Sequence, residues 1–474
     1  MDEDGQDMEF SEDELKALIS KFEEMLVKNE ELFYDSSEFE LIINHYFEAN
    51  DIKKAYRAIN MAKTQYPFAP VFHIRHAQIL AASGKHERAL EIIEKIEEFE
   101  EKNSEVMITK GSIYSQKGDF DKAIECFNRA IDFADKEDHD FIYLNIAYEY
   151  INKSQPAKAT EFLKKCLEEN PSNEIALYEL AFCYELTAQH QEAVEYYQHF
   201  LEENPFSPVA WFNLGISFSN LHLLEKAVEA YDFAIAIDPS FASAYFNKAN
   251  ALANSSKYKE AIEEYKKTFD LETAESITHY YIGECYEKLE ELDKATYHYT
   301  LSIKLDEGFP DPYIGMAVVL EFQGRLLEAI NFAQKGVNLE PNNSDFIYIL
   351  AEMQHRHGLL EEAQSNYEKV FELDPTNEDV WLDYTEVLFD QDYREEAITV
   401  LKEAIIVFAK NVEYKYRLVA YLYKIGHIKE AFEQLENALT LDFEKHNSLF
   451  DYFPPLKESK TVIGIIDNYR NKKP

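Results

Sequence analysis

The strongest constraint on the fold is one alanine that returns along most of the chain at a nearly constant interval. The interval is 34 residues at every step but one, which is 36 residues between Ala123 and Ala159. A period of this length indicates a linear stack of similar repeats, each contacting mainly its neighbours, in place of several globular domains. The recurring alanines are Ala55, Ala89, Ala123, Ala159, Ala193, Ala227, Ala261, Ala295, Ala329, Ala363, Ala397 and Ala431.

Each period carries the pattern of two amphipathic helices, which is clearest in residues 208–241. With Pro208 as position 1, positions 4, 7, 8 and 11, and then 20, 24 and 27, hold residues at the spacing of one helix face. Pro239, at position 32, ends the second helix because proline cannot continue it. Position 8 is glycine or alanine in nine successive repeats, which predicts a close approach of the two helices.

Position 15 is expected to end the first helix in a left-handed conformation. Glycine, which adopts this conformation readily, stands there in five repeats. Asn50 and His222 are expected to take the same role in two others. The glycines are Gly84, Gly118, Gly324, Gly358 and Gly426.

The pattern resembles the signature of the tetratricopeptide repeat (TPR), and the residues that carry it are Trp211, Leu214, Gly215, Phe218, Ala227, Tyr231, Ala234 and Pro239. The resemblance extends over twelve consecutive repeats, from 36–69 to 412–445. It implies an all-α fold, a right-handed superhelical α-solenoid of about twelve TPR helix-turn-helix repeats with N- and C-terminal capping helices. Trp211 and Trp381, both at position 4, are expected to be buried between the helices of their repeats.

Three segments are expected from this pattern. Residues 1–35 form an acidic N-terminal tail and a capping helix that begins after Ser11, residues 36–445 form the twelve tandem repeats, and residues 446–474 form a C-terminal capping helix with a basic end. Apolar stripes on the two terminal helices are suited to cover the open ends of the stack.

The charge of the chain restricts the kinds of partner. Lys and Arg number 47 and Asp and Glu 90, which gives a net charge of −43. Such a charge repels nucleic acid and anionic membrane surfaces, so a basic or neutral protein partner is expected. The acidic start and the lack of an apolar run of about 18 residues indicate a cytoplasmic protein. Cys126, Cys166, Cys183 and Cys285 lack a C-x-x-C pair and are interpreted as buried, reduced thiols.

Catalytic motifs are not apparent in the sequence. It contains no phosphate-binding glycine loop, no G-x-S-x-G and no H-E-x-x-H. His73 and His76 fall at positions 4 and 7, where packing is the simplest role. Because only the two terminal segments lie outside the repeats, we expect no enzyme activity, no cofactor and no metal.

The first-helix positions that packing leaves over are 2, 5, 6, 9, 12 and 13, which we call the first-helix stripe. In proteins that this chain resembles, this stripe lines a concave groove that holds extended peptides. Asparagines and aromatic residues gather there in the middle of the chain, and an asparagine amide can bond a peptide backbone through both donor and acceptor. The predicted peptide-binding residues are Asn145, Tyr148, Tyr178, Phe182, Phe212, Asn213, Asn220, Phe246, Asn247, Asn250 and Asn254. In the alternative interpretation, the aromatic residues pack between neighbouring repeats and the asparagines face water.

The leading hypothesis for function is a scaffold that binds a peptide or protein segment in an acidic concave groove. A structural role, in which the solenoid assembles with itself without a peptide ligand, is the alternative. Nucleic-acid binding by helical repeats is disfavoured because phosphate neutralisation needs Lys and Arg. The oligomeric state is left open.

Overall fold

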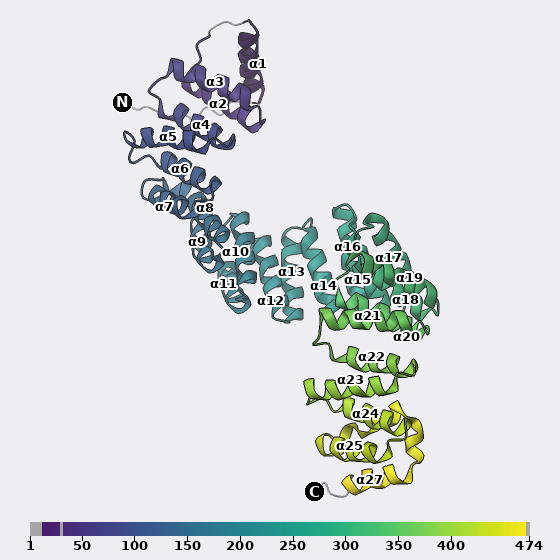
Figure 1. Cartoon of the computed structure of the whole chain (residues 1–474). Coiled ribbons are helices and arrows are strands. Elements are labelled where there is room, and N and C mark those ends of the chain that lie inside the picture. The colour runs from purple at the N-terminus through teal and green to yellow at the C-terminus, as the bar shows by residue number, and fades with distance from the viewer. Residues whose placement is uncertain (1–11, 29–31, 471–474) are drawn as a thin grey trace. The chain divides into compact units, whose positions relative to one another are not determined.

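The computed structural model describes residues 12–28 and 32–470, and within these ranges the chain is built from helices without strands (Figure 1). The chain divides into two compact units, residues 1–244 and 245–474, which we call the N-terminal and C-terminal units. Each is described by itself. The predicted acidic tail, the Ser11 cap and the basic end lie outside the described residues.

Helix pairs follow the predicted period, with an even-numbered first helix and an odd-numbered second helix in each repeat. The first helices are α2 (Ser36–Glu48), α4 (Pro70–Ala82), α6 (Ser104–Gln116), α8 (His139–Asn152), α10 (Glu174–Leu186), α12 (Pro208–Asn220), α14 (Ala242–Asn254), α16 (Ser276–Lys288), α18 (Asp311–Phe322), α20 (Ser344–Arg356), α22 (Glu378–Asp390) and α24 (Glu413–Lys424). The second helices are α3 (Ile52–Gln65), α5 (His86–Glu97), α7 (Phe120–Ile131), α9 (Pro156–Glu169), α11 (His190–Glu203), α13 (Leu224–Ile237), α15 (Tyr258–Leu271), α17 (Leu292–Leu305), α19 (Leu326–Leu339), α21 (Leu360–Leu373), α23 (Arg394–Val407) and α25 (Ile428–Leu441).

Packing inside a repeat depends on small residues at positions 8 and 20. Every recurring alanine at position 20 is buried. At position 8, a Cβ added to Gly215 would lie 2.5 Å from the ring of Tyr231, and one added to Gly283 would lie 2.6 Å from the ring of Tyr299. Both rings stand at position 24 of the same repeat, so the position-24 ring occupies the space that the missing side chain leaves. The predicted close approach of the two helices is confirmed.

The turn between the two helices is uniform. Twelve of the described residues have a positive φ, and each of them stands at position 15 of its repeat. The five predicted glycines are among them, as are Asn50 and His222. The others were not anticipated: Ser154, Ala188, Ser256, Glu290 and Asp392. Of these, only aspartate is a residue type that tolerates the left-handed conformation.

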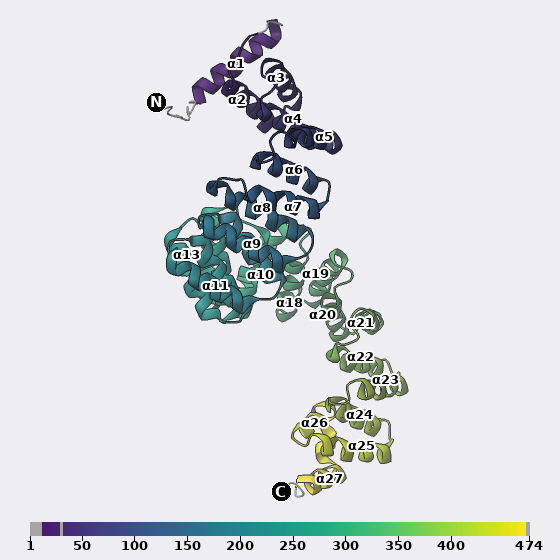
Figure 2. The ribbon, with the colours of Figure 1, turned by 90° about the vertical axis from the view of Figure 1, so that its left-hand side faces the viewer.

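Additional helices cover the outermost helix pairs of the two units. In the N-terminal unit, α1 (Glu12–Lys28) buries Phe22 and Met25 against residues of α2, Phe39 among them. In the C-terminal unit, α26 (Ser448–Tyr452) lies beside α24 and α27 (Lys460–Arg470) beside α25 (Figure 2). Their buried Leu449 and Ile466 belong to the same hydrophobic core as those helices.

Two expectations on particular side chains had different outcomes. The four cysteines are free and buried, as predicted. Trp211 is only partly buried: it stacks on Phe233 at 4.4 Å, and its Nε1 donates to the carbonyl of Pro205 at 2.9 Å. Trp381 is also partly buried. An indole is too large to fit wholly between two helices that approach this closely, which is why both reach the surface. None of the described helices is long and apolar enough to cross a membrane.

We expect Gly215→Ala to lower the free energy of unfolding by about 1–2 kcal/mol. The new methyl group overpacks the Tyr231 ring at a cost of roughly 1–3 kcal/mol, and the better helix propensity of alanine returns up to about 1 kcal/mol. Urea unfolding followed by Trp211 fluorescence measures the loss in a Trp381→Phe background, since the chain has two tryptophans. Gly464→Ala, where an added Cβ would have no neighbour within 4 Å, is the control and should keep or raise stability. An unchanged unfolding midpoint for Gly215→Ala would contradict the packing described.

At position 15 we expect Ala188→Gly to raise the free energy of unfolding by about 0.5–1 kcal/mol, because glycine relieves the left-handed strain at some entropic cost. Gly84→Ala is the reciprocal variant and should lose about 1 kcal/mol, since alanine is strained at positive φ. Thermal and urea unfolding of both variants test this, and a loss of stability in Ala188→Gly would contradict the turn geometry.

Candidate functional site

The predicted peptide-binding residues divide between the two units. The N-terminal unit contains Asn145, Tyr148, Tyr178, Phe182, Phe212, Asn213 and Asn220, and the C-terminal unit contains Phe246, Asn247, Asn250 and Asn254. The two sets are therefore treated as separate surfaces.

Asn213 and Phe212 are packing residues in the N-terminal unit. Asn213 is 1% exposed, and its Nδ2 donates to the carbonyl of Leu177 at 2.9 Å, on the preceding first helix α10. Phe212 is also buried, with its ring 4.9 Å from that of Phe241. Because position 6 of α12 faces the preceding repeat, the amide of Asn213 joins two helices and is not open to a peptide. Phe212 therefore packs as the alternative interpretation expects, whereas Asn213 neither faces water, as that interpretation expects, nor lies open to a peptide.

The remaining residues of the N-terminal set are more open. Tyr178, Phe182 and Asn220 are exposed, and Tyr148 is half-buried. The Nδ2 of Asn145 donates a hydrogen bond to the carbonyl of Phe141 in its own helix, at 2.7 Å. These side chains offer aromatic surface. Of the three amides predicted to accompany them, however, those of Asn145 and Asn213 bond within the protein, and only that of Asn220 is exposed.

The C-terminal set includes two residues that line a pocket of about 510 Å³ between α14 and α16, which we call the α14–α16 pocket. Asn250 and Asn254, at positions 9 and 13 of α14, face Glu284 and Lys288, at the same positions of α16. The lining residues are Asn250, Ala253, Asn254, Ser256, Tyr258, Tyr265, Tyr281, Glu284, Cys285 and Lys288. The structure therefore brings polar residues of two successive first-helix stripes together around one cavity.

Aromatic rings form one wall of the α14–α16 pocket. Tyr265 is buried and stacks on Tyr281, with ring centroids 6.0 Å apart and an interplanar angle of 5°. Phe246 lies against both rings, at 5.6 Å and 5.8 Å. The Tyr265 hydroxyl donates to Oδ1 of Asn250, which fixes the amide and presents its NH₂ group as the donor that remains for a ligand. Asn247 is half-buried and interacts within the protein.

Among the described residues that line the pocket, Glu284 is the one carboxylate and Lys288 is the one base. Burial raises the pKa of its carboxyl above the usual range, although the hydroxyl of Tyr280 donates to its Oε1 at 2.9 Å and favours the charged form. Glu287 and Asp311 add like charges, which raise the pKa further, while Lys288 lowers it. A carboxylate that its surroundings hold at an elevated pKa gains from a cation brought beside it.

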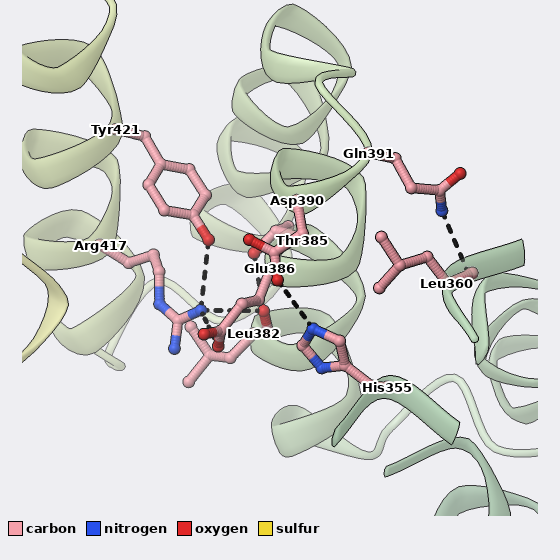
Figure 3. Close-up of polar contacts among 9 residues, drawn as sticks. All are labelled: His355, Leu360, Leu382, Thr385, Glu386, Asp390, Gln391, Arg417 and Tyr421. Carbon is pink, nitrogen blue, oxygen red and sulfur yellow. Dashed lines mark hydrogen bonds and ion pairs between the residues drawn. The ribbon is translucent and has the colours of Figure 1, made fainter. Parts of the chain in front are cut away.

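A second polar cluster of the C-terminal unit lies on α20, α22 and α24, and the sequence analysis missed it (Figure 3). Arg417 is buried, yet its Nη1 donates to the carbonyl of Leu382 at 3.2 Å, to Oε2 of Glu386 at 3.0 Å and to the hydroxyl of Tyr421 at 3.3 Å. Its guanidinium also lies 4.3 Å from the Tyr452 ring centroid. These contacts hold α24 to α22 and α26, so this cluster is chiefly structural.

Neighbouring members of the polar cluster reach from one first helix to the next. The Tyr348 hydroxyl donates to Oδ2 of Asp383, and burial raises the pKa of that carboxyl. His355 lies 3.0 Å from Asp390 through Nε2 and Oδ2 (Figure 3). The partners are 35 residues apart, or about one period, so a search for polar pairs at that spacing in the sequence could have found them.

Comparisons with known proteins agree with the repeat architecture. A family model described as tetratricopeptide repeat-like domain matches residues 6–148, and two described as tetratricopeptide repeat match residues 151–214 and 354–422, and residues 212–270. No curated protein matches the sequence.

Three of the solved structures similar to this chain show the range of the matches. The Cut9–Hcn1 hetero-tetramer of the APC/C shares 14% identity, covering 90% of this chain and 99% of that chain, with a TM-score of 0.42. The C-terminal part of a TPR repeat-containing protein from Cytophaga hutchinsonii shares 20%, covering 51% and 99%, with a TM-score of 0.44. YrrB, a TPR protein with an unusual peptide-binding site, shares 23%, covering 39% and 95%, with a TM-score of 0.32. With the 34-residue signature, the helix pairs of the described chain and the three family models in agreement, this chain belongs to the tetratricopeptide repeat family.

Proposed function

We propose that this chain is a non-catalytic scaffold that binds an extended segment of a protein partner in the α14–α16 pocket. Tetratricopeptide repeat proteins mediate protein–protein interactions. The composition of the α14–α16 pocket supports it as the binding site in this chain. Two asparagines, one acid and one base from successive first-helix stripes surround a single cavity of about 510 Å³ with a stacked aromatic wall. The buried cysteine thiols suit a reducing compartment, and we place the protein in the cytoplasm.

The pocket suits a peptide backbone together with a basic side chain. The exposed amide of Asn254 supplies both a donor and an acceptor to a main-chain amide, and the NH₂ of Asn250 supplies a second donor. Glu284 is suited to pair with a lysine or arginine of the bound segment, because a cation beside it stabilises the charged carboxylate that burial disfavours. The net charge of −43 favours the approach of such a segment from solution.

We expect the double variant Asn254→Ala/Glu284→Gln to capture its partner from an extract of the native host at least tenfold less well than the wild type. One neutral and one charged hydrogen bond are together worth about 2–4 kcal/mol, and each 1.4 kcal/mol corresponds to roughly a factor of ten. Glutamine at 284 keeps an acceptor for the Tyr280 hydroxyl, so the melting temperature should hold. Quantitative mass spectrometry of the captured protein gives the measurement.

Matched controls separate the pocket from general charge and amide effects. Glu260→Gln and Asn331→Ala make the same chemical changes at exposed positions on second helices, and neither should reduce capture. A photo-crosslinking residue in place of Asn254 should label the same partner. Full capture by the double variant, or labelling of a different protein, would remove the pocket as the binding site.

Binding in the α14–α16 pocket should weaken as ionic strength rises from low to physiological, mainly through a slower association rate. With the captured partner purified, surface plasmon resonance at several salt concentrations gives that dependence. Glu284→Gln should flatten it, whereas Asn254→Ala should weaken binding and leave the slope unchanged. An affinity insensitive to salt would show that the partner does not form an ion pair with Glu284.

A further inference from the structure

The connections between repeats carry a feature that lies outside the first-helix stripe. Six repeats have proline at position 32, and the residue after it, at position 33, is exposed in all six. Four of these residues are polar, namely Ser172, Ser240, Asn342 and Thr376. The other two are Phe68 and Phe206, which are 94% and 82% exposed and both belong to the N-terminal unit.

Three of the four polar residues at position 33, Ser172, Ser240 and Thr376, have a structural role that phenylalanine cannot fill. The hydroxyl of Ser172 donates to Oδ1 of Asn170 at 2.7 Å, two residues earlier, and the hydroxyl of Thr376 donates to Oδ1 of Asp374 at 2.6 Å. These bonds close the turn between repeats. Phe206 follows Asn204, which could accept the same bond, so phenylalanine here gives up a turn contact and exposes a large apolar ring. A residue that works against local stability in this way points to function.

Both connections follow the same Pro-Phe-x-Pro pattern. They read Pro67-Phe68-Ala69-Pro70 and Pro205-Phe206-Ser207-Pro208, with prolines that fix φ on either side of the exposed ring. A ring held on a stiff loop loses little conformational freedom when it binds, which favours its use as a contact residue. We call these two segments the Phe68 and Phe206 loops.

Each loop borders a pocket. Phe68 lines one of about 690 Å³, together with Ile92, Ile96 and the largely exposed Phe99. Phe206 lines one of about 500 Å³, together with Leu177. Single exposed apolar side chains are ordinary on protein surfaces. These two differ from the others in standing at the same position of the repeat, each beside a pocket.

Carboxylates stand beside both rings. Glu100 lines the Phe68 pocket, and Glu174 and Glu203 line the Phe206 pocket, all of them exposed. The Phe68 pocket also holds Lys95, and Lys63, whose Nζ is engaged 3.1 Å from Nδ1 of His76. The Phe206 pocket has no basic residue among its described lining.

A ring beside a carboxylate suits arginine more than any other side chain. The guanidinium plane stacks on an aromatic face while its edge pairs with a carboxylate, and its weak hydration makes this less costly than for lysine. Apolar side chains next to the arginine would contact Ile92 and Ile96 in the Phe68 pocket and the proline rings that line the Phe206 pocket.

We propose that the Phe68 and Phe206 loops form a second interaction surface of the N-terminal unit, which binds an arginine-bearing apolar segment of a protein partner. The surface is independent of the α14–α16 pocket and goes beyond the function proposed for it. Arginine stacks on the phenylalanine ring and pairs with the neighbouring glutamate, and the apolar residues of the segment enter the pocket.

The test replaces both rings with the residue that other repeats carry. Phe68→Ser/Phe206→Ser leaves the charge of the chain unchanged and should keep or raise the melting temperature, because a serine at 206 can bond Asn204. The probe is a labelled twelve-residue synthetic peptide of alternating arginine and leucine, measured by fluorescence anisotropy with the full chain at physiological salt. Its affinity should fall at least tenfold in the double variant.

Controls distinguish this surface from other contacts. Phe322→Ser removes another exposed phenylalanine, 74% exposed in the C-terminal unit, and should leave the affinity unchanged. The Asn254→Ala/Glu284→Gln variant should also retain peptide binding, so failure of one proposal is visible separately from failure of the other. A peptide with glutamate in place of arginine should not bind, and one with lysine should bind more weakly.

Three results would overturn the proposal. The first is an unchanged affinity of the double variant for the arginine peptide. The second is equal binding of the lysine peptide, which would show attraction by charge alone. The third is wild-type self-association that the double variant abolishes in sedimentation velocity, which would make a second copy of this chain the occupant of the loops.

Discussion

The repeats with glycine at position 8 depend on one contact, in which the ring at position 24 of the second helix lies against that glycine of the first. Tyr231 against Gly215 and Tyr299 against Gly283 are the closest examples. Together with the buried alanine at position 20, this contact brings the two helices together on a narrow seam. Positions of the first helix that packing leaves over, such as 9 and 13, can then differ from repeat to repeat without loss of the fold.

The period predicted the helix pairs and the seam, because both follow from residue size and spacing alone. The turns were predicted less completely. Glycine in the sequence predicted five of the left-handed residues, but Ala188 and Glu290 are residue types that do not predict this conformation. At those positions the conformation is imposed by the two helices that pack on either side, and tertiary contacts override the preference of the residue itself.

The candidate site was predicted only in part, and position 6 shows why. The sequence placed Asn213 on the first-helix stripe, but its side chain reaches back to the main-chain carbonyl of Leu177 in the preceding repeat. Arg417, also at position 6, does the same with Leu382. In both repeats position 6 joins neighbouring first helices, whereas positions 9 and 13 surround the α14–α16 pocket. Which of these roles a polar residue takes depends on the facing helix, about one period away in the sequence.

The strained turns have a mechanical consequence. Five consecutive repeats, the fourth to the eighth, hold a residue other than glycine at position 15: Ser154, Ala188, His222, Ser256 and Glu290. Each stores about 1–2 kcal/mol that a glycine turn does not. Under a pulling force, we expect these hairpins to open at a lower load than neighbouring hairpins that turn on glycine. Replacing the five turn residues with glycine should remove that difference.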